Sequence, residues 1–198
     1  MHPDGDDLFP VPDATLAALS HRLAGAAARE GLLDVAYREL DSPVGTLLVA
    51  GTERGLLRIA FRRNGFDDVL AELADRVSPR LLLAPARLDD AARQLGEYFA
   101  GTRHTFDLPL DRRLSSGFRG AVHLALDGID YGRTTTYAQL AALLGNPKAV
   151  RAVGTACATN PLPVVVPCHR VVRSDGSLGG YAGGGDAKAV LLALERTA

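Results

Sequence analysis

The hexapeptide VPCHRV at residues 166–171 sets a thiol beside an imidazole and a guanidinium, directly after a proline. Apolar residues precede it, so we expect Cys168 at the end of a buried strand or in a tight turn. Only a thiolate attacks, and His169 and Arg170 supply a base and a positive charge that favour one. Because adjacent strand residues point to opposite faces, His169 reaches Cys168 only through a turn or a bridging water.

Two other interpretations fit this hexapeptide when it is taken alone. Cysteine is among the most buried residue types, so Cys168 fits an ordinary core position. A cysteine hydrolase that uses Cys168 and His169 is the second alternative, and it predicts repeated turnover of an ester or amide. The sequence on either side of the hexapeptide has to decide between them.

Upstream of the hexapeptide, periodic apolar residues predict helices over residues 118–126 and 136–144. We expect a third helix to begin at Asn146-Pro147, because asparagine caps helices and proline is tolerated at the first helical position. Two helices joined by a glycine turn form a helix-turn-helix candidate. The alternative is a helix pair that forms only a packing corner, and a helix pair by itself favours that alternative.

The N-terminal half shows a different pattern. Alternating apolar residues separated by turn signals predict a meander of antiparallel strands, and helical patterns that follow would cover one face of the sheet. An amphipathic helix is expected before the strands. The strands are expected at residues 35–40, 46–50 and 56–61, and the helices at 13–30, 67–77 and 88–99.

The fold class predicted from these patterns is α+β, in three parts. Residues 1–34 form an N-terminal extension with helical character, residues 35–110 an α/β domain, and residues 111–198 a mostly helical domain. The connection falls between residues 105 and 114, where periodicity is low and Pro109 interrupts the pattern.

Composition narrows the class of protein. The 198 residues are 47% hydrophobic, enough for a sizeable core, and include two cysteines, Cys157 and Cys168. No CxxC pair or cysteine-histidine cluster occurs, so we expect no disulfide framework, no metal site and a reducing cytoplasmic location. No apolar run approaches the roughly 20 residues of a membrane span, and the first residues lack a basic leader.

Charge is distributed unevenly although the net charge is −1. Residues 1–111 hold 12 basic and 18 acidic side chains, whereas residues 112–173 hold 8 basic and 2 acidic ones. The basic stretch is a candidate surface for phosphate groups, although such a stretch is often only a solvated face.

Several short motifs occur in order between Tyr131 and Glu195. Together with the hexapeptide they resemble the O6-alkylguanine-DNA alkyltransferases over the C-terminal half, while the first hundred residues resemble that family only loosely. The motifs are Tyr131-Gly132, Thr136-Tyr137, Gln139-Leu140-Ala141, Gly145-Asn146-Pro147, Arg151-Ala152-Val153-Gly154, Asn160-Pro161 and Gly180-Tyr181-Ala182-Gly183-Gly184.

The resemblance implies a fold, an activity and a partner. The fold would combine a ribonuclease-H-like N-terminal domain with a helical domain that carries a winged-helix-like helix-turn-helix. The activity would be DNA repair, in which O6-alkylguanine, mainly O6-methylguanine, is flipped out of the duplex and the alkyl group is transferred irreversibly to Cys168 in a single turnover. The protein would be a monomer without cofactor or metal, bound to double-stranded DNA through the minor groove.

The resemblance also implies residue roles in the chemistry. Cys168 would attack the alkyl carbon, with His169 as its base through a water and Glu195 orienting the imidazole. Tyr137 would bind DNA near the rotated 3′ phosphate and the guanine N3, and would donate a proton or hydrogen bond there as guanine departs. Asn160 would join the reactive turn to the DNA-reading helix. Taken alone, these residues fit a core tyrosine, an Asn-Pro turn and a surface glutamate.

The remaining implied roles concern DNA and the guanine pocket. Arg151 would fill the gap left in the base stack, and the small residues Ala152 and Gly154 would let the helix approach the groove, although they fit tight helix packing equally well. Glycines in the pocket loop permit close backbone approach. The implied pocket residues are Arg170, Val171, Gly180, Tyr181, Ala182 and Lys188.

Two positions depart from the family pattern. Ala182 stands where some members have serine, and His123 stands where many have tryptophan, so packing around these positions is in question. A non-catalytic lesion-binding protein of the same fold is the remaining alternative, and the presence of Cys168 argues against it, because those relatives lack the acceptor cysteine.

Overall fold

The computed structural model describes residues 12–196. In the N-terminal half, strands β1 (Val35–Leu40), β2 (Leu47–Thr52) and β3 (Gly55–Phe61) form the predicted antiparallel meander. A fourth strand, β4 (Leu81–Leu83), pairs parallel to β1 and completes the order β3-β2-β1-β4. Three residues are too few for a periodic signal, so the sequence did not reveal β4.

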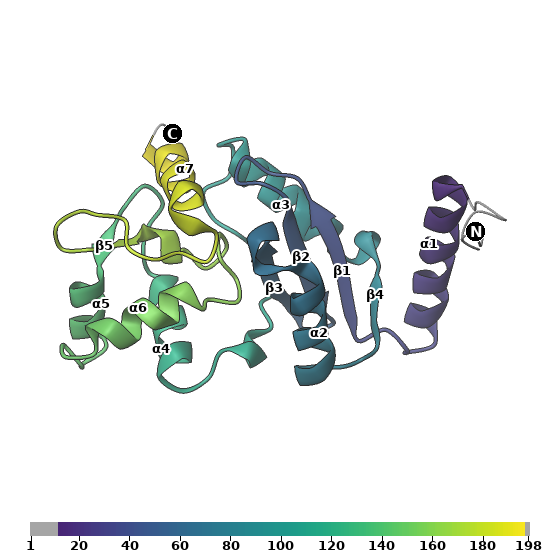
Figure 1. Cartoon of the computed structure of the whole chain (residues 1–198), viewed down its shortest axis with the longest axis horizontal. Coiled ribbons are helices and arrows are strands. Elements are labelled where there is room, and N and C mark those ends of the chain that lie inside the picture. Colours follow the sequence, from purple (N-terminus) through teal and green to yellow (C-terminus); the bar gives the residue numbers. More distant parts are fainter. Residues whose placement is uncertain (1–11, 197–198) are drawn as a thin grey trace, which may run out of the picture.

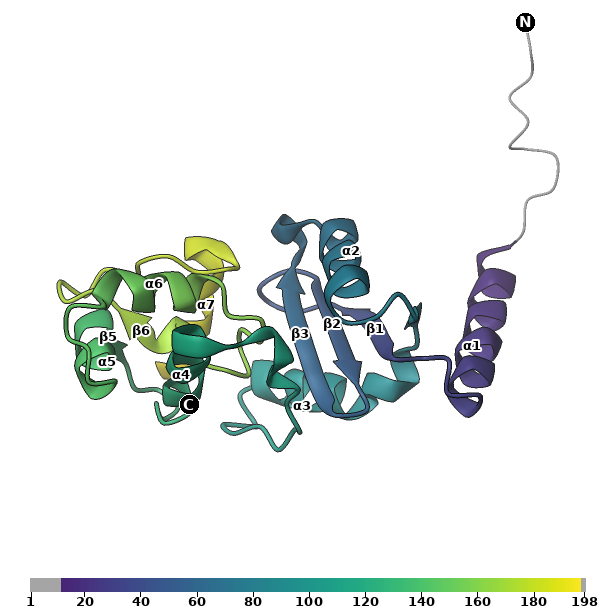
Figure 2. The same ribbon diagram turned by 90° about the horizontal axis from the view of Figure 1, so that it is seen from below.

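The prediction that both helices cover one face of this sheet was wrong. Helix α2 (Phe66–Arg76) and helix α3 (Asp89–Phe99) lie on opposite faces, as Figure 2 shows. Strand β2 is buried along both faces, with Leu48 packing in the cluster of α2 and Leu47 in the cluster of α3. Each face of a sheet that is apolar on both sides needs its own cover.

Helix α1 (Asp13–Arg29) confirms the helix expected over residues 13–30. It lies at the end of the molecule remote from the C-terminal half, beyond β4 (Figure 1). Ala24 and Ala27 are buried, whereas Leu19 and Leu23 are 50% and 58% exposed, so one side of this helix has no apolar cover among the described residues. The limits of the three predicted parts stay a prediction.

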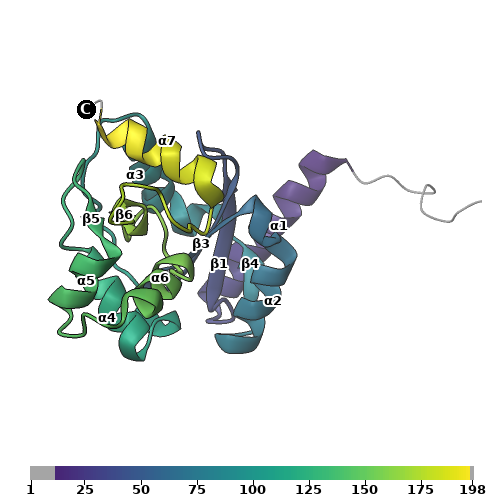
Figure 3. The same cartoon turned by 60° about the vertical axis from the view of Figure 1, so that its left-hand side comes forward.

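The C-terminal half is mostly helical. Helices α4 (Gly117–Leu126), α5 (Tyr137–Leu143) and α6 (Val150–Ala158) pack together. Helix α7 (Gly184–Arg196) lies at the opposite end of this half, near α3, and contacts residues 168–170 (Figure 3). A two-stranded parallel pair, β5 (Thr135–Thr136) with β6 (Val171–Val172), ties the start of α5 to the chain after Cys168. Thr136 caps α5 by accepting from the Gln139 amide at 3.1 Å.

The expectation that a helix begins at Asn146-Pro147 was wrong, because α6 begins at Val150. Asn146 completes the end of α5 instead: its amide donates to Ala141 O at 3.0 Å and that of Gly145 donates to Ala142 O at 2.9 Å. Gly145 has a φ of 71°. This is the glycine cap of a helix C-terminus, and it uses the backbone that a new helix would have needed.

His123, the departure from tryptophan, is buried and fully hydrogen-bonded. Its Nε2 donates to Ala156 O at 2.9 Å, and its Nδ1 accepts from the Ser115 hydroxyl at 2.8 Å. Burial lowers the pKa of this imidazole, so it stays neutral. The imidazole of His123 therefore joins α4 to α6.

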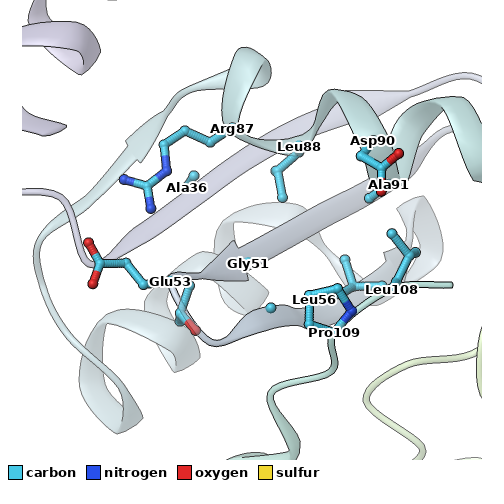
Figure 4. A pocket seen from close by; sticks show the side chains of 12 residues that line it. Ala36, Gly51, Glu53, Leu56, Arg87, Leu88, Asp90, Ala91, Leu108 and Pro109 are labelled. Carbon is cyan, nitrogen blue, oxygen red and sulfur yellow. The ribbon is translucent and has the colours of Figure 1, made fainter.

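A cavity of about 290 Å³ lies between the sheet and α3. Figure 4 shows Leu56, Leu88 and Ala91 on its apolar side, with the charged ends of Glu53 and Arg87 at another edge. Cys168 does not line it. No helix among residues 12–196 is both long and apolar enough to cross a bilayer.

Candidate active site around Cys168

Cys168 begins a single 3₁₀ turn, Cys168–Arg170, which confirms the expected tight turn. The Cys168 amide donates to Val166 O at 2.8 Å, and the Arg170 amide donates to Pro167 O at 3.0 Å. Val164 adopts a φ of 75°, a left-handed conformation that is costly for a β-branched residue. The surrounding structure therefore forces this segment into a fixed, strained path.

Asn160 holds the reactive sulfur from the end of α6. Its Nδ2 donates to Cys168 Sγ at 3.2 Å and to Val166 O at 2.8 Å, while its Oδ1 accepts from the Leu162 amide at 3.0 Å. Burial raises the pKa of the Cys168 thiol to about 11, and the Asn160 hydrogen bond and the Lys188 charge act in the opposite direction. The thiol is therefore protonated at rest and needs a base.

His169 is fully buried beside Cys168 in the chain. Its Nε2 lies 2.8 Å from Glu195 Oε1 on α7. Burial lowers the pKa of this imidazole, although the Glu195 carboxylate works in the opposite direction. The ring is therefore a neutral base, and no described residue hydrogen-bonds its Nδ1.

Glu195 is surrounded by hydrogen-bond donors. Arg170 binds it with both Nε and Nη2, each at 2.9 Å, and the Gly132 amide donates at 3.1 Å. Burial by itself would raise the pKa of Glu195, but the hydrogen bonds from His169 and Arg170 outweigh it and hold the pKa well below the ordinary value. An ionised carboxylate only accepts, so Nε2 of His169 must carry the proton and Nδ1 is left as the basic nitrogen.

Sequence reasoning missed Tyr98, which reaches this group from α3. Its hydroxyl donates to Glu195 Oε1 at 2.7 Å and lies 3.5 Å from His169 Nε2. The side chain is completely buried. A tyrosine in an apolar helical stripe signals only core packing, so nothing in the pattern of the N-terminal half could have connected it to the cysteine turn.

Lys188 and Tyr137 form a second polar group near Val171. The completely buried Lys188 Nζ donates to Val171 O at 2.6 Å, to Leu178 O, and to the Tyr137 hydroxyl at 3.4 Å. Burial raises the pKa of Tyr137 to about 12 and lowers that of Lys188. The carbonyl oxygens of Cys168 and Val171 each accept one hydrogen bond, from the Val171 amide and from Lys188 Nζ, which leaves one lone pair on each for a ligand.

The glycine-rich loop packs against His169, the neighbour of Cys168, and against Phe61 of β3. Tyr181 is 9% exposed, and its ring contacts the rings of His169 and Phe61 edge to face, at centroid distances of 6.3 and 5.6 Å. A Cβ on Gly183 would lie 2.7 Å from the Phe61 ring, so glycine is needed there. Cys168 itself has no exposed surface, so its sulfur is closed to any substrate in this conformation.

Unlike Tyr137, the other predicted DNA-contacting residues lie on α6 and make none of the hydrogen bonds of this cluster. Arg151 and Ala152 are exposed at the start of α6, next to Val150, which is 37% exposed. A Cβ on Gly154 would meet nothing within 4 Å, so tight helix packing does not explain this glycine. Ala182 lies near Asn160 at the edge of a cavity of about 280 Å³, and Gly180 O accepts from the Tyr137 hydroxyl at 3.4 Å.

Among residues 12–196, no group of three or more histidine, cysteine, aspartate or glutamate side chains could hold a metal ion. The polar groups around Cys168 are instead committed to one another through the hydrogen bonds given above. The chemistry that this arrangement can support is proton transfer and nucleophilic attack by sulfur.

Two family descriptions match this chain, one in each half. Residues 35–112 match the ribonuclease-like domain of 6-O-methylguanine DNA methyltransferase, and residues 117–197 match its DNA binding domain. The chain belongs to the 6-O-methylguanine DNA methyltransferase family. This confirms the resemblance, the α+β fold class and the assignment of the chain as a methyltransferase.

Individual members of the 6-O-methylguanine DNA methyltransferase family support this placement. The methylated-DNA–protein-cysteine methyltransferase of Mycolicibacterium paratuberculosis is 41% identical, covering 82% of this chain and 93% of the relative. The constitutive enzyme of Bacillus subtilis is 40% identical, covering 81% of this chain and 94% of the relative. The crystal structure of the Mycobacterium tuberculosis O6-methylguanine methyltransferase has a TM-score of 0.73 at 37% identity, covering 82% of this chain and 93% of that one.

Proposed function

We propose that this protein repairs duplex DNA by taking the alkyl group of O6-alkylguanine, mainly a methyl group, irreversibly onto Cys168. The contacts around Cys168 Sγ carry the proposal. Asn160 donates a hydrogen bond to this sulfur. His169, the residue after Cys168, is a neutral buried base whose Nε2 is held by Glu195. The product is a thioether, which is a poor leaving group, so each molecule acts once. No cofactor is needed, because the substrate brings the alkyl group and the protein supplies the acceptor.

The chemical step is a displacement at the alkyl carbon. The thiol proton passes to His169 Nδ1 through a water, the sulfur–carbon bond forms, and the bond from that carbon to O6 breaks. The bonding pair stays with guanine, whose ring takes a proton from Tyr137; the protonated imidazole and the phenolate then return to their resting states by exchange with solvent. Asn160 stabilises the thiolate by its hydrogen bond, and Glu195 stabilises the imidazolium.

Duplex DNA would bind along α6, with the minor groove facing this helix. The Mycobacterium tuberculosis relative has been solved in complex with DNA, at a TM-score of 0.71 and 38% identity. Arg151 is exposed at the start of α6, where a planar cation can take the place of a base that has left the stack. Ala152 and Gly154 leave little bulk between this helix and the groove.

The flipped guanine would enter a pocket formed by the loop around Gly180, Tyr181 and Ala182, with Val171 and Lys188 opposite. Tyr181 would cover the base once the loop has opened, and the Ala182 amide would donate to O6. Arg170 would hold the reactive turn through Glu195 and Ile129 O, which it binds at 2.5 Å, without touching substrate. We infer a cytoplasmic monomer, which suits two free, buried cysteines.

Stoichiometry tests this function directly. After incubation with excess duplex containing O6-methylguanine, we expect intact-mass analysis to find one methyl group per protein, on the peptide that contains Cys168. Repeated turnover of an ester or amide without a lasting mass change would instead support the cysteine hydrolase. Tight binding of the methylated duplex without any transfer would support the non-catalytic lesion-binding protein.

The variant Arg151→Ala tests the role of α6 in base flipping. Loss of the side chain that fills the stack should slow methyl transfer from duplex DNA by about tenfold, because unstacking a base costs a few kcal/mol. Transfer from a single-stranded methylated oligonucleotide, measured by the same mass assay, should change little. The matched control is Arg54→Ala, which removes an exposed arginine in the turn between β2 and β3; equal slowing by both variants would contradict a stacking role.

A further inference from the structure

A residue of the sheet domain enters the hydrogen-bond group behind the reactive cysteine. Tyr98 lies on α3, and its hydroxyl donates to Glu195 Oε1 on α7 at 2.7 Å. This contact joins positions 97 residues apart in the chain. Both side chains are buried, so the hydrogen bond is made without competition from solvent.

The ring of Tyr98 is held by other aromatic side chains, so the position of its hydroxyl is well defined. Phe99, Phe106 and Tyr131 contact it at centroid distances of 5.4, 5.3 and 6.1 Å. A tyrosine with two rotatable side-chain bonds, packed on several sides, can present its hydroxyl in only a narrow range of directions. The hydroxyl is thus a fixed donor rather than an adaptable one.

Three donors converge on the same carboxylate oxygen. Glu195 Oε1 accepts from Tyr98, from His169 Nε2 at 2.8 Å and from Arg170 Nη2 at 2.9 Å. A hydrogen bond donated to a carboxylate stabilises its charge and weakens its attraction for any other proton. Removing the tyrosine donor should therefore let Glu195 hold the imidazole proton more strongly, and let the carboxylate rotate.

We propose that Tyr98 is a positioning residue for alkyl transfer, which the sheet domain supplies to the Cys168 turn. Its hydroxyl fixes Glu195 Oε1 so that His169 keeps its proton on Nε2 and presents Nδ1 to the thiol. The proposal rests on the function inferred above for Cys168. It gives the ribonuclease-like domain a direct part in the reaction, beyond supporting the fold.

The charges that face His169 come from several elements, and any effect of pH must be judged against all of them. Glu195 raises its pKa, whereas Arg170 and Lys188 lower it. The other titratable groups nearby are Tyr98, Tyr181 and Cys168. Because Tyr98→Phe leaves all of these charges in place, a change in the pH profile of this variant reports on the hydroxyl alone.

The test compares Tyr98→Phe with the wild type in single-turnover methyl transfer between pH 5 and 9. At pH 7 we expect the rate to fall about tenfold, the loss that corresponds to one hydrogen bond to a charged group. The midpoint of the acid limb, where His169 gains a proton, should move up by at least about half a pH unit. An unchanged midpoint would reduce Tyr98 to a packing residue and overturn the proposal.

Tyr131→Phe is the matched control. It removes a hydroxyl from the same aromatic group, but one that has no hydrogen-bond partner among residues 12–196. Its pH profile should match that of the wild type. Equal shifts in both variants would mean that the aromatic packing, and not the contact with Glu195, sets the profile.

A second measurement separates this proposal from the proposed function. Alkylation of Cys168 by iodoacetamide, followed by peptide mass across the same pH range, needs no DNA. If wild-type protein takes no methyl group but Tyr98→Phe still shifts the iodoacetamide profile, the function fails and the positioning role stands. In the double variant Tyr98→Phe/Glu195→Gln the shift should vanish, because the hydroxyl acts through the carboxylate; a shift that persists would count against that route.

Discussion

Replacement of Cys168 by serine should abolish methyl transfer. The sulfur has both a hydrogen-bond donor, Asn160, and a neutral base in the adjoining residue, His169. A serine hydroxyl is a far weaker nucleophile than a thiolate, so we expect the single-turnover rate to fall at least about a thousandfold. Intact mass after incubation with methylated duplex should then show no added methyl group.

Cys157→Ala is the control for that experiment. Cys157 is the other free cysteine, buried in α6, where burial raises its pKa to about 12. This variant should still take one methyl group per molecule. Transfer that survives in Cys168→Ser but is lost in Cys157→Ala would place the acceptor at the wrong sulfur and refute the proposed function.

Replacement of Glu195 by glutamine should weaken both the fold and the reaction. Arg170 would stay buried without the negative charge that balances it. Removing one partner of a buried ion pair lowers the free energy of unfolding by about 3 kcal/mol or more. The imidazolium would also lose its stabilising charge, so we expect methyl transfer to slow about a hundredfold. Denaturant unfolding and the single-turnover mass assay measure the two effects separately.

The stability effect of Glu195 has a defined pH dependence. Its folded-state pKa is held below the ordinary value of 4.5, so the carboxylate stabilises the fold fully above that pH and loses this contribution as pH falls toward the lower folded-state pKa. The stability difference between wild type and Glu195→Gln should therefore shrink below about pH 4.5. Glu97→Gln removes a half-buried carboxylate on α3 whose pKa is also lowered, by hydrogen bonds from Arg103 and Arg93. Its stability difference should be much smaller than that of Glu195→Gln at every pH, because solvent screens these ion pairs.

The local architecture of this protein followed from sequence periodicity and turn residues. The three-stranded meander and the helices at residues 13–30, 67–77, 88–99, 118–126 and 136–144 all appear, each displaced by no more than a residue or two. Where two local sequence signals conflicted, the predicted helix boundary was wrong. Asn146-Pro147 reads as a helix start, but Gly145 and Asn146 were already committed to the end of α5.

The placement of layers needed the tertiary structure. Residues 47–50 of strand β2 are apolar without interruption, but this run does not show that the two faces of the sheet carry different helices, because α2 and α3 have similar apolar stripes. Which face of the sheet each helix covers depends on the direction that the chain takes between the strand and the helix. Strand β4 was invisible for a related reason: three residues become a strand only through their pairing with β1.

By itself, the sequence determined the reactive element of this protein, because Cys168, His169 and Arg170 are neighbours in the chain and their turn is set by local bonds. Only the tertiary structure decided what those residues do to one another. Glu195, Asn160 and Tyr98 approach the turn from α7, the end of α6 and α3, and they come together because burying their separate apolar faces brings those elements into one core. Hydrogen bonds between such distant positions leave no periodic trace in the chain.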